Sequence, residues 1–232
     1  MAIAHRGASA YAPENTVAAF DEAIRLGAAA VEFDVRLTAD GIPVVLHDAT
    51  LDRTTNGHGA VARRTWVELL RLDAGSWKHP RFAGTRIPTV EEALRAMDRR
   101  AIPVLELKTP LDPQRLHRLL ADHAVLDHAV VLSFQAQLLA KLHRCMRRLT
   151  LGLLANRWRP GLPRLCQQVD AQILALSYSA LTLQRAQQVA GEKRRLWCYT
   201  VNDVAAIAAC TAVGVEGVIT DYPDRIGARP KT

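Results

Sequence analysis

Short apolar runs alternate with longer stretches of helical periodicity along almost the whole chain, and this alternation limits the possible folds more than any other feature. Eight runs have the length and apolar, partly β-branched composition of buried strands. Strands of this kind that alternate with helices form parallel sheets. The predicted strands are residues 2–5, 29–35, 102–107, 129–133, 149–154, 172–176, 195–200 and 217–220.

Helical segments are predicted between most of these strands. Val17, Phe20 and Ile24 share one face of a helix that Gly27 ends, because glycine readily adopts the backbone conformation found just after a helix. The segment 89–100 begins with Thr-Val-Glu-Glu, whose Thr and second Glu form a capping box. Helical spacing continues in Leu116, Leu119 and Leu120 and in Leu138, Leu139 and Leu142.

The number of repeats indicates the fold class. Eight strand–helix repeats in 232 residues predict an α/β protein of the (β/α)8 TIM barrel type, and a doubly wound open sheet is the alternative. We expect a single domain over residues 1–232, with the last residues, 228–232, frayed. Polar residues at the carboxyl ends of the strands are then the candidate site residues.

One further apolar run, residues 43–47, does not fit the repeat. The Asp-Gly pair at 40–41 is a signal for a two-residue hairpin, and two residues cannot hold a parallel crossover. The run should therefore return antiparallel to the strand before it. If the turn is at 40–41, paired residue numbers sum to 81, which places Asp34 opposite His47 with Glu32 on the same face.

The segment of about 48–87 is irregular and rich in Thr, Gly, Arg and His. It is longer than an ordinary loop, so we expect a small insertion over the barrel mouth.

Composition excludes a membrane-spanning protein. No apolar run approaches the roughly 18 residues of a membrane span, and no basic segment followed by an apolar one stands at the amino end. We expect a cytoplasmic protein without stable membrane insertion, and no feature indicates an oligomeric state. The four cysteines lack metal-like spacing and are expected to be reduced, without disulfides. They are Cys145, Cys166, Cys198 and Cys210.

The net charge of +7 is unevenly distributed. No acidic residue lies between Asp127 and Asp170, and the basic residues of this stretch predict a solvent-exposed helix face or a field that attracts an anionic substrate. No nucleic-acid partner is expected, because Trp158 is the one aromatic residue in its basic part. The basic residues are Lys141, Arg144, Arg147, Arg148, Arg157, Arg159 and Arg164.

Acidic side chains interrupt two otherwise apolar strands. Glu32 and Asp34 point to one side of their strand, and Glu106 and Lys108 repeat the arrangement. Carboxylates gathered without a cation would repel one another, so these predict a three-carboxylate site for a hard divalent ion, Mg²⁺ or Ca²⁺ rather than Zn²⁺. The alternative is a set of internal salt bridges with Lys108 and Arg6.

Two histidines end predicted strands beside these acids. His5 ends the first strand and His47 ends the hairpin strand. Because histidine titrates near neutral pH, one of them can accept a proton from a nucleophile while the other gives one to a leaving alkoxide. The other six histidines are interpreted as structural or surface residues.

These residues belong to an ordered series of motifs that resembles the glycerophosphodiester phosphodiesterases, most closely the short cytosolic bacterial members. The resemblance covers the chain from His5 to about Pro223. Each motif alone is weak, but their order is specific. The motifs are His5-Arg6-Gly7, Pro13-Glu14-Asn15-Thr16, Glu32-Phe33-Asp34-Val35, Asp40-Gly41, Val44-Val45-Leu46-His47-Asp48, Leu51-Asp52-Arg53-Thr54-Thr55-Asn56-Gly57, Glu106-Leu107-Lys108 and Tyr199-Thr200-Val201-Asn202.

The resemblance implies a barrel of the same superfamily as phosphatidylinositol-specific phospholipase C, and metal-dependent hydrolysis of small glycerophosphodiesters to sn-glycerol 3-phosphate and the headgroup alcohol. The family often has Trp where this chain has Tyr199, which still offers a flat face to the substrate. The implied site residues are Glu32, Asp34 and Glu106 for the metal, His5 and His47 as acid and base, and Arg6 and Lys108 for the phosphate.

Several alternatives stay open at this point. Either histidine can be the acid, and attack can come from the glycerol 2-hydroxyl, through a cyclic phosphate, or directly from water. A phospholipase acting on intact lipids would need an exposed apolar rim, for which the insertion offers Trp66, Trp77, Phe82 and some leucines. A non-catalytic barrel that binds an acidic partner would not need the complete set of acids and histidines.

Overall fold

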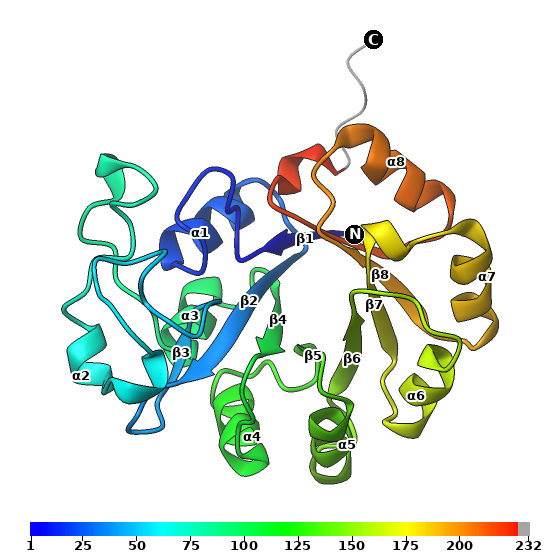
Figure 1. The fold of residues 1–232 in the computed structure, drawn as a ribbon, viewed down its shortest axis with the longest axis horizontal. Coiled ribbons are helices and arrows are strands. Elements are labelled where there is room, and N and C mark those ends of the chain that lie inside the picture. Colours follow the sequence, from blue (N-terminus) through cyan, green and yellow to red (C-terminus); the bar gives the residue numbers. More distant parts are fainter. Residues whose placement is uncertain (227–232) are drawn as a thin grey trace.

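The computed structural model describes residues 1–226, and its strands close into a barrel (Figure 1). Eight parallel strands pair around the ring in the order β1-β9-β8-β7-β6-β5-β4-β2, and β1 pairs with β2 to close it. The prediction of a (β/α)8 TIM barrel is confirmed, and the open-sheet alternative is wrong. The barrel strands are Ala2–His5 (β1), Ala30–Leu37 (β2), Ile102–Leu107 (β4), Val130–Ser133 (β5), Thr150–Ala155 (β6), Ile173–Ser177 (β7), Arg195–Tyr199 (β8) and Gly217–Thr220 (β9).

Helices surround the strands in Figure 1. Most begin with a side chain that accepts a hydrogen bond from the first turn, and the capping box of Thr89 and Glu92 is formed as predicted. That helix ends at Met97 rather than near Arg100, because Asp98 and Arg99 adopt left-handed backbone conformations. The helices are Val17–Arg25 (α1), Trp66–Leu69 (α2), Val90–Met97 (α3), Pro113–Asp122 (α4), Ala136–Cys145 (α5), Leu162–Gln168 (α6), Leu183–Gly191 (α7) and Val204–Ala212 (α8).

The barrel interior is apolar toward the amino ends of its strands. Each barrel strand contributes one or two buried side chains there, and Trp197 is the largest of them. A Cβ atom on Gly217 would lie 2.7 Å from the Trp197 ring, so glycine is needed where the indole crosses β9. This layer consists of Ile3, Ala30, Val104, Val130, Leu132, Leu154, Ile173, Ala175, Trp197 and Ile219. A second, larger core packs the outer strand faces against the helices.

The predicted hairpin forms, with a register one residue away from the expected one. β3 (Pro43–Val45) runs antiparallel to β2, with Val45 opposite Val35, so paired numbers sum to 80 rather than 81. The cause is a three-residue loop that ends in Gly41 at φ 77, in place of the two-residue turn. The residue opposite Asp34 is Leu46, whose N–H bonds the Asp34 carbonyl at 3.0 Å. The pairing of Asp34 with His47 is therefore wrong.

The connection from β3 to α3 is the predicted insertion. It contains α2 and short 3-10 turns. Its own apolar cluster packs against β3, and Leu51, Leu69 and Ile87 of this cluster are almost completely buried. In Figure 1 this segment lies to one side of the ring, beside β3. It therefore adds a wall at the edge of the barrel.

Two other expectations concern the described residues. All four cysteines are free, as predicted; Cys145 is exposed and the other three are buried. None of the helices in residues 1–226 has the length and apolar character needed to cross a membrane. The expectation of fraying at 228–232 falls outside the described residues.

Candidate active site

Three carboxylates meet at the carboxyl ends of β2 and β4. Asp34 pairs directly with Glu106 across these strands, and Glu32 lies two residues earlier on the same face as Asp34. One oxygen of each carboxylate lies within 4.8 Å of the others. Glu32 and Asp34 are only 2% and 1% exposed. The predicted acidic cluster is therefore assembled, with Glu106 beside Asp34.

The cationic side chains of Lys108 and Arg6 lie against these acids. Lys108 Nζ is 3.1 Å from Asp34 and also bonds Glu106, while Arg6 Nε is 3.3 Å from Asp34. Burial raises the pKa of Asp34, but the charges of Lys108 and Arg6 outweigh burial and hold that pKa below its ordinary value. The salt bridges considered as an alternative to a metal site are present, and they are concentrated on Asp34.

Glu32 and Glu106 are less well compensated. Burial, together with the negative charge of Asp34, raises the pKa of both carboxyl groups. Glu32 Oε2 accepts the Arg6 backbone N–H at 2.9 Å, whereas the buried Oε1 has no hydrogen-bond partner in residues 1–226. A buried, unpartnered carboxylate oxygen facing other carboxylates is the arrangement that a cation would satisfy.

The residues therefore fit a divalent cation. Glu32, Asp34 and Glu106 offer oxygen ligands alone, which suits a hard ion such as Mg²⁺ or Ca²⁺ and is a poor match for Zn²⁺ sites built from Cys or His. Of the alternatives raised by the sequence, the geometry supports salt bridges and a cation site together.

A tight turn after β1 aims the backbone at this cluster. Arg6 and Gly7 both have positive φ, 56° and 81°. A Cβ atom on Gly7 would lie 2.6 Å from the backbone of Ala19 in α1, so only glycine fits this close approach. The turn directs the backbone N–H of Arg6 toward Glu32 and the guanidinium of Arg6 toward Asp34.

Asn15 holds Asp34 in place. Its amide nitrogen donates to Asp34 Oδ2 at 2.8 Å, and its amide oxygen accepts the Asp34 backbone N–H at 3.1 Å. Asn15 adopts φ 60°, a left-handed conformation that asparagine tolerates better than most residues. The sequence motif contained Asn15, but no role for it was predicted.

His5 is oriented by a residue at the far end of the chain. Its Nδ1 lies 2.7 Å from Asp221 Oδ1, and Asp221 also accepts bonds from Ser9 and Asn202. Burial raises the pKa of Asp221, but these hydrogen bonds outweigh it and lower the pKa to about 2. Asp221 is therefore a carboxylate at neutral pH, which means that His5 Nδ1 carries the proton and donates it.

His47 has a matching partner. Its Nδ1 lies 2.7 Å from Asp48 Oδ1, and hydrogen bonds from Arg53 and His47 hold the pKa of Asp48 well below its usual range. His47 Nδ1 is thus the donor, and burial lowers the pKa of His47 itself. Within residues 1–226, the Nε2 atom of neither His5 nor His47 has a hydrogen-bond partner. Nε2 of each imidazole is therefore available to exchange a proton with a ligand.

A chain of ion pairs joins the two sides of the site. Glu14 bonds Arg6 at 2.8 Å and Arg53 at 2.8 Å, and Arg53 continues to Asp48 at 2.6 Å. Arg6 at the acidic cluster is therefore connected to Asp48, which orients His47. This connection fixes the position of Arg6 relative to Asp48.

Tyr199 ends β8 on the interior face, two residues after Trp197. Its hydroxyl donates to Asn156 Oδ1 at 3.1 Å, and its ring meets that of Phe134 edge to face at 6.3 Å between centroids. Burial, followed by the charge of Glu106, raises the pKa of Tyr199. The ring thus forms part of the barrel mouth near the acids.

Every predicted site residue therefore lies at the same mouth of the barrel, while several supporting residues were missed. Asp221 had a detectable signal in the sequence, because it lies two residues after Ile219 and so on the same face of β9. His5 lies two residues after Ile3 on β1 in the same way. Its bond to His5 spans 216 residues and has no local sequence signal. The missed residues are Glu14, Asn15, Arg53, Asn202 and Asp221.

Comparisons with known proteins agree with this geometry. Residues 5–225 match the model of the Glycerophosphoryl diester phosphodiesterase family. A glycerophosphodiester phosphodiesterase of Caldanaerobacter subterraneus subsp. tengcongensis is 34% identical over 241 residues, covering 97% of this chain and 96% of the relative. One from Bacillus subtilis (strain 168) is 31% identical over 252 residues, covering 97% of this chain and 84% of the relative.

A solved structure is also similar. An Oleispira antarctica phosphodiesterase in complex with the product sn-glycerol-3-phosphate superposes with a TM-score of 0.92 at 30% identity. The alignment covers 97% of this chain and 94% of that one.

Proposed function

Since this chain belongs to the glycerophosphoryl diester phosphodiesterase family and is a hydrolase, we propose that it cleaves small glycerophosphodiesters to sn-glycerol 3-phosphate and the headgroup alcohol with His5 and His47 as acid and base. The observation that carries the proposal is the pair of histidines, each bonded through Nδ1 to a carboxylate, at the mouth that contains the acidic cluster. The product named in the Oleispira antarctica complex supports the choice of glycerol phosphate.

The two imidazoles supply the proton transfers. A neutral imidazole whose Nδ1 donates to Asp221 or Asp48 presents a lone pair at Nε2 and can take a proton from an attacking hydroxyl. A protonated one presents an N–H there and can give its proton to the departing alkoxide. In the proposed reaction the oxygen of the attacking hydroxyl, from water or from the glycerol 2-hydroxyl, forms a bond to phosphorus while its proton passes to the neutral imidazole. The bond from phosphorus to the headgroup oxygen breaks, and the protonated imidazole gives its proton to that oxygen. If the glycerol 2-hydroxyl attacks, water then opens the cyclic phosphate by the same proton transfers in reverse.

Glu32, Asp34 and Glu106 are the proposed ligands of one Mg²⁺ or Ca²⁺ ion. When bound, a divalent cation neutralises negative charge that develops on the phosphate oxygens. Arg6 and Lys108 lie against the same acids and are proposed to contact the phosphate, while the Tyr199 ring packs against the substrate. The bound cation, Arg6 and Lys108 would together place positive charge where the reacting phosphate is most negative.

The test is an assay of the purified protein with sn-glycero-3-phosphocholine and sn-glycero-3-phosphoglycerol. We expect release of sn-glycerol 3-phosphate, complete loss after EDTA treatment, and recovery when Mg²⁺ or Ca²⁺ is added. Intact phospholipid vesicles serve as the comparison and should be cleaved far more slowly. Absence of glycerol phosphate would contradict the function, and activity that survives thorough chelation would contradict the metal site alone.

A further inference from the structure

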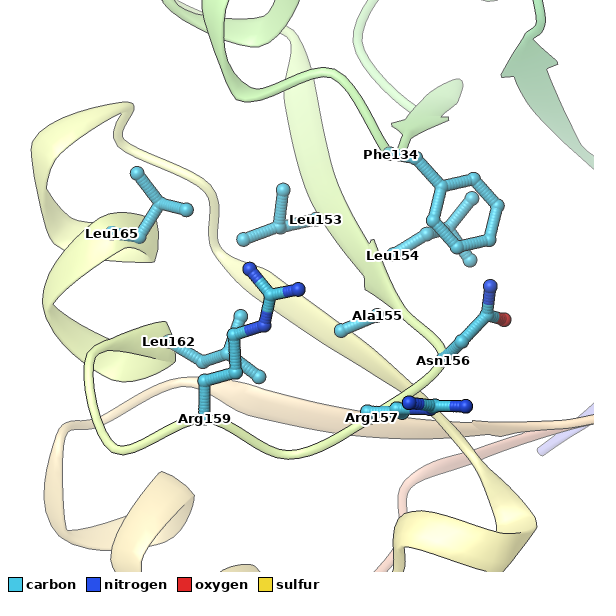
Figure 2. Close-up of a pocket in the computed structure, with 9 residues that line it drawn as sticks. All are labelled: Phe134, Leu153, Leu154, Ala155, Asn156, Arg157, Arg159, Leu162 and Leu165. Atoms are coloured by element: carbon cyan, nitrogen blue, oxygen red, sulfur yellow. The ribbon is translucent and has the colours of Figure 1, made fainter.

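A second feature of the barrel mouth has no part in the catalysis proposed above. A hollow of about 430 Å³ lies between the carboxyl end of β6 and α6 (Figure 2). Its walls are mainly apolar, with Leu153, Leu162 and Leu165 on the side of α6. The volume is within the range of small-ligand sites, roughly 300 to 1,000 Å³.

The hollow adjoins the candidate active site. Its other side is formed by Phe134 and Asn156, and Tyr199 contacts both of these residues. The strand register supports the same placement, because Glu106 pairs with Leu132 and Phe134 follows two residues later on that face. A ligand group bound in the hollow would therefore lie next to the mouth that holds the acids.

Two arginines of the loop between β6 and α6 give the hollow its charge. In Figure 2 the guanidinium of Arg159 points from the loop into the hollow, and that of Arg157 lies below Asn156. Both side chains are exposed, and neither guanidinium makes an ion pair or hydrogen bond with any of residues 1–226. Arg6 and Arg53, in contrast, both pair with Glu14, and each has a further carboxylate partner, Asp34 for Arg6 and Asp48 for Arg53.

A different hollow lies on the other flank of the site, beside His5. Its volume is about 380 Å³, and its lining includes the polar side chains of Ser9, Lys78 and Asn202. Hydroxyl and amide groups of this kind suit the hydroxyls of glycerol. The two hollows therefore differ in chemistry, since one is lined mainly by polar and charged side chains and the other is mainly apolar with two exposed arginines.

On the basis of the proposed function, we infer that the hollow beside β6 receives the leaving alcohol and that Arg157 and Arg159 select alcohols that carry a phosphate group of their own. Two guanidinium groups match the several oxygens of a phosphate with directed, charge-assisted hydrogen bonds. The leucines of the wall contact the carbon skeleton. The local absence of acidic residues, which extends from Asp127 to Asp170, leaves this charge available to a ligand.

The experiment compares two diesters that differ by one group. They are sn-glycero-3-phosphoglycerol and the same compound with a phosphate on its terminal hydroxyl. We expect the wild-type kcat/KM for the phosphorylated diester to be about tenfold higher, as one or two charge-assisted hydrogen bonds provide. Arg157→Gln and Arg159→Gln should each lower the ratio of the two kcat/KM values severalfold, and the double variant should remove the preference.

Arg164→Gln is the matched control. It removes the same charge from the same basic stretch, but Arg164 is exposed on α6 and does not line the hollow. This variant should keep the wild-type ratio. An unchanged ratio in the double variant, or an equal fall in Arg164→Gln, would overturn the inference, the latter because it would indicate a general electrostatic effect.

A binding measurement separates this inference from the proposed function. Calorimetric affinities of both diesters for the His5→Ala/His47→Ala double variant do not depend on turnover. A preference that disappears with Arg157→Gln/Arg159→Gln in this background supports the site even if neither diester is hydrolysed. Equal affinities overturn it even if hydrolysis is observed.

Discussion

The two halves of the barrel interior are made by the same strands, yet they contrast in chemistry. Toward the amino ends, Ile3, Ala30 and Val104 pack with Trp197 in an apolar layer. Two residues further along the same strands, toward their carboxyl ends, lie His5, Glu32 and Glu106. Their side chains are buried or partly buried among like and opposite charges.

This contrast separates stability from reactivity. The apolar layer at the amino ends is the lower layer, and the charged one at the carboxyl ends is the upper layer. Burial of apolar side chains in the lower layer stabilises the fold by about 25 cal/mol for each Å² removed from water. The upper layer contains carboxylates whose pKa is raised by burial, such as Glu32, so their charged forms oppose folding. The lower layer thus supports a set of groups that would not assemble alone. Substitutions in the two layers should have different consequences.

The largest effect is expected at the histidines of the upper layer. His5→Ala or His47→Ala should each lower kcat by about 10² to 10⁴, the usual contribution of an acid or base. The free energy of unfolding should change by only about 1 kcal/mol, the value of one hydrogen bond. Steady-state kinetics and denaturant unfolding measure the two quantities.

The control for these variants is His117→Ala, which changes an exposed histidine of α4. It should leave both quantities at the wild-type level. Retention of more than about a tenth of wild-type turnover in either site variant would show that its imidazole is not a proton-transfer group.

Trp197→Ala should have the opposite profile. Removing this 1% exposed side chain leaves a cavity beside Gly217, and the free energy of unfolding should fall by about 3 to 5 kcal/mol. At temperatures where the variant is folded, kcat should fall far less than in the histidine variants. Tyr199→Phe, two residues away on β8, is the stability control and should cost about 1 kcal/mol or less. Equal losses in both would mean that the lower layer is not the stabilising one.

The smallest effect concerns Asp221 and depends on pH. Because the folded-state pKa of Asp221 is about 2, below the ordinary value of 3.8 for an aspartate side chain, its stabilisation is present above the unfolded pKa and is lost as pH falls through the folded one. Asp221→Asn should therefore reduce the free energy of unfolding by about 2 kcal/mol at pH 6. The difference from wild type should close between about pH 4 and pH 2.

Asp122→Asn, at an exposed carboxylate of α4, provides the reference for that titration. It should lie within about 0.5 kcal/mol of wild type throughout. A gap between Asp221→Asn and wild type that persists unchanged at pH 2 would assign the loss to packing rather than to the carboxylate charge.

Much of the fold was predictable because its signals are local. The β-branched runs and helical spacing located all eight barrel strands within about two residues, and the capping box at Thr89 marked the start of α3 correctly. The hairpin was predicted, but its register was not. Asp-Gly is compatible with a two-residue or a three-residue loop, and the longer one with Gly41 in the left-handed conformation moved every pair by one residue.

The site shows the same division. Glu32, Asp34 and Glu106 were recognisable because each is a polar residue at an inward position of an apolar strand, and Lys108 because it follows Glu106 by two residues. Asn15 was not assigned, because it lies in a loop and its contact with Asp34 depends on how that loop folds back over β2. Local patterns reveal that a residue is unusual, but they do not identify its partner.

The sequence by itself determined the alternation of strands and helices and the chemical character of each inward position, since both depend on periodicity within a few residues. Only the tertiary structure decided which groups meet. Closure of β1 against β9 brings Asp221 to His5, and the loop after β6 leaves Arg157 and Arg159 without acidic partners among the described residues. Such contacts join residues far apart in the chain, so they depend on barrel closure, strand register and loop geometry rather than on any local preference.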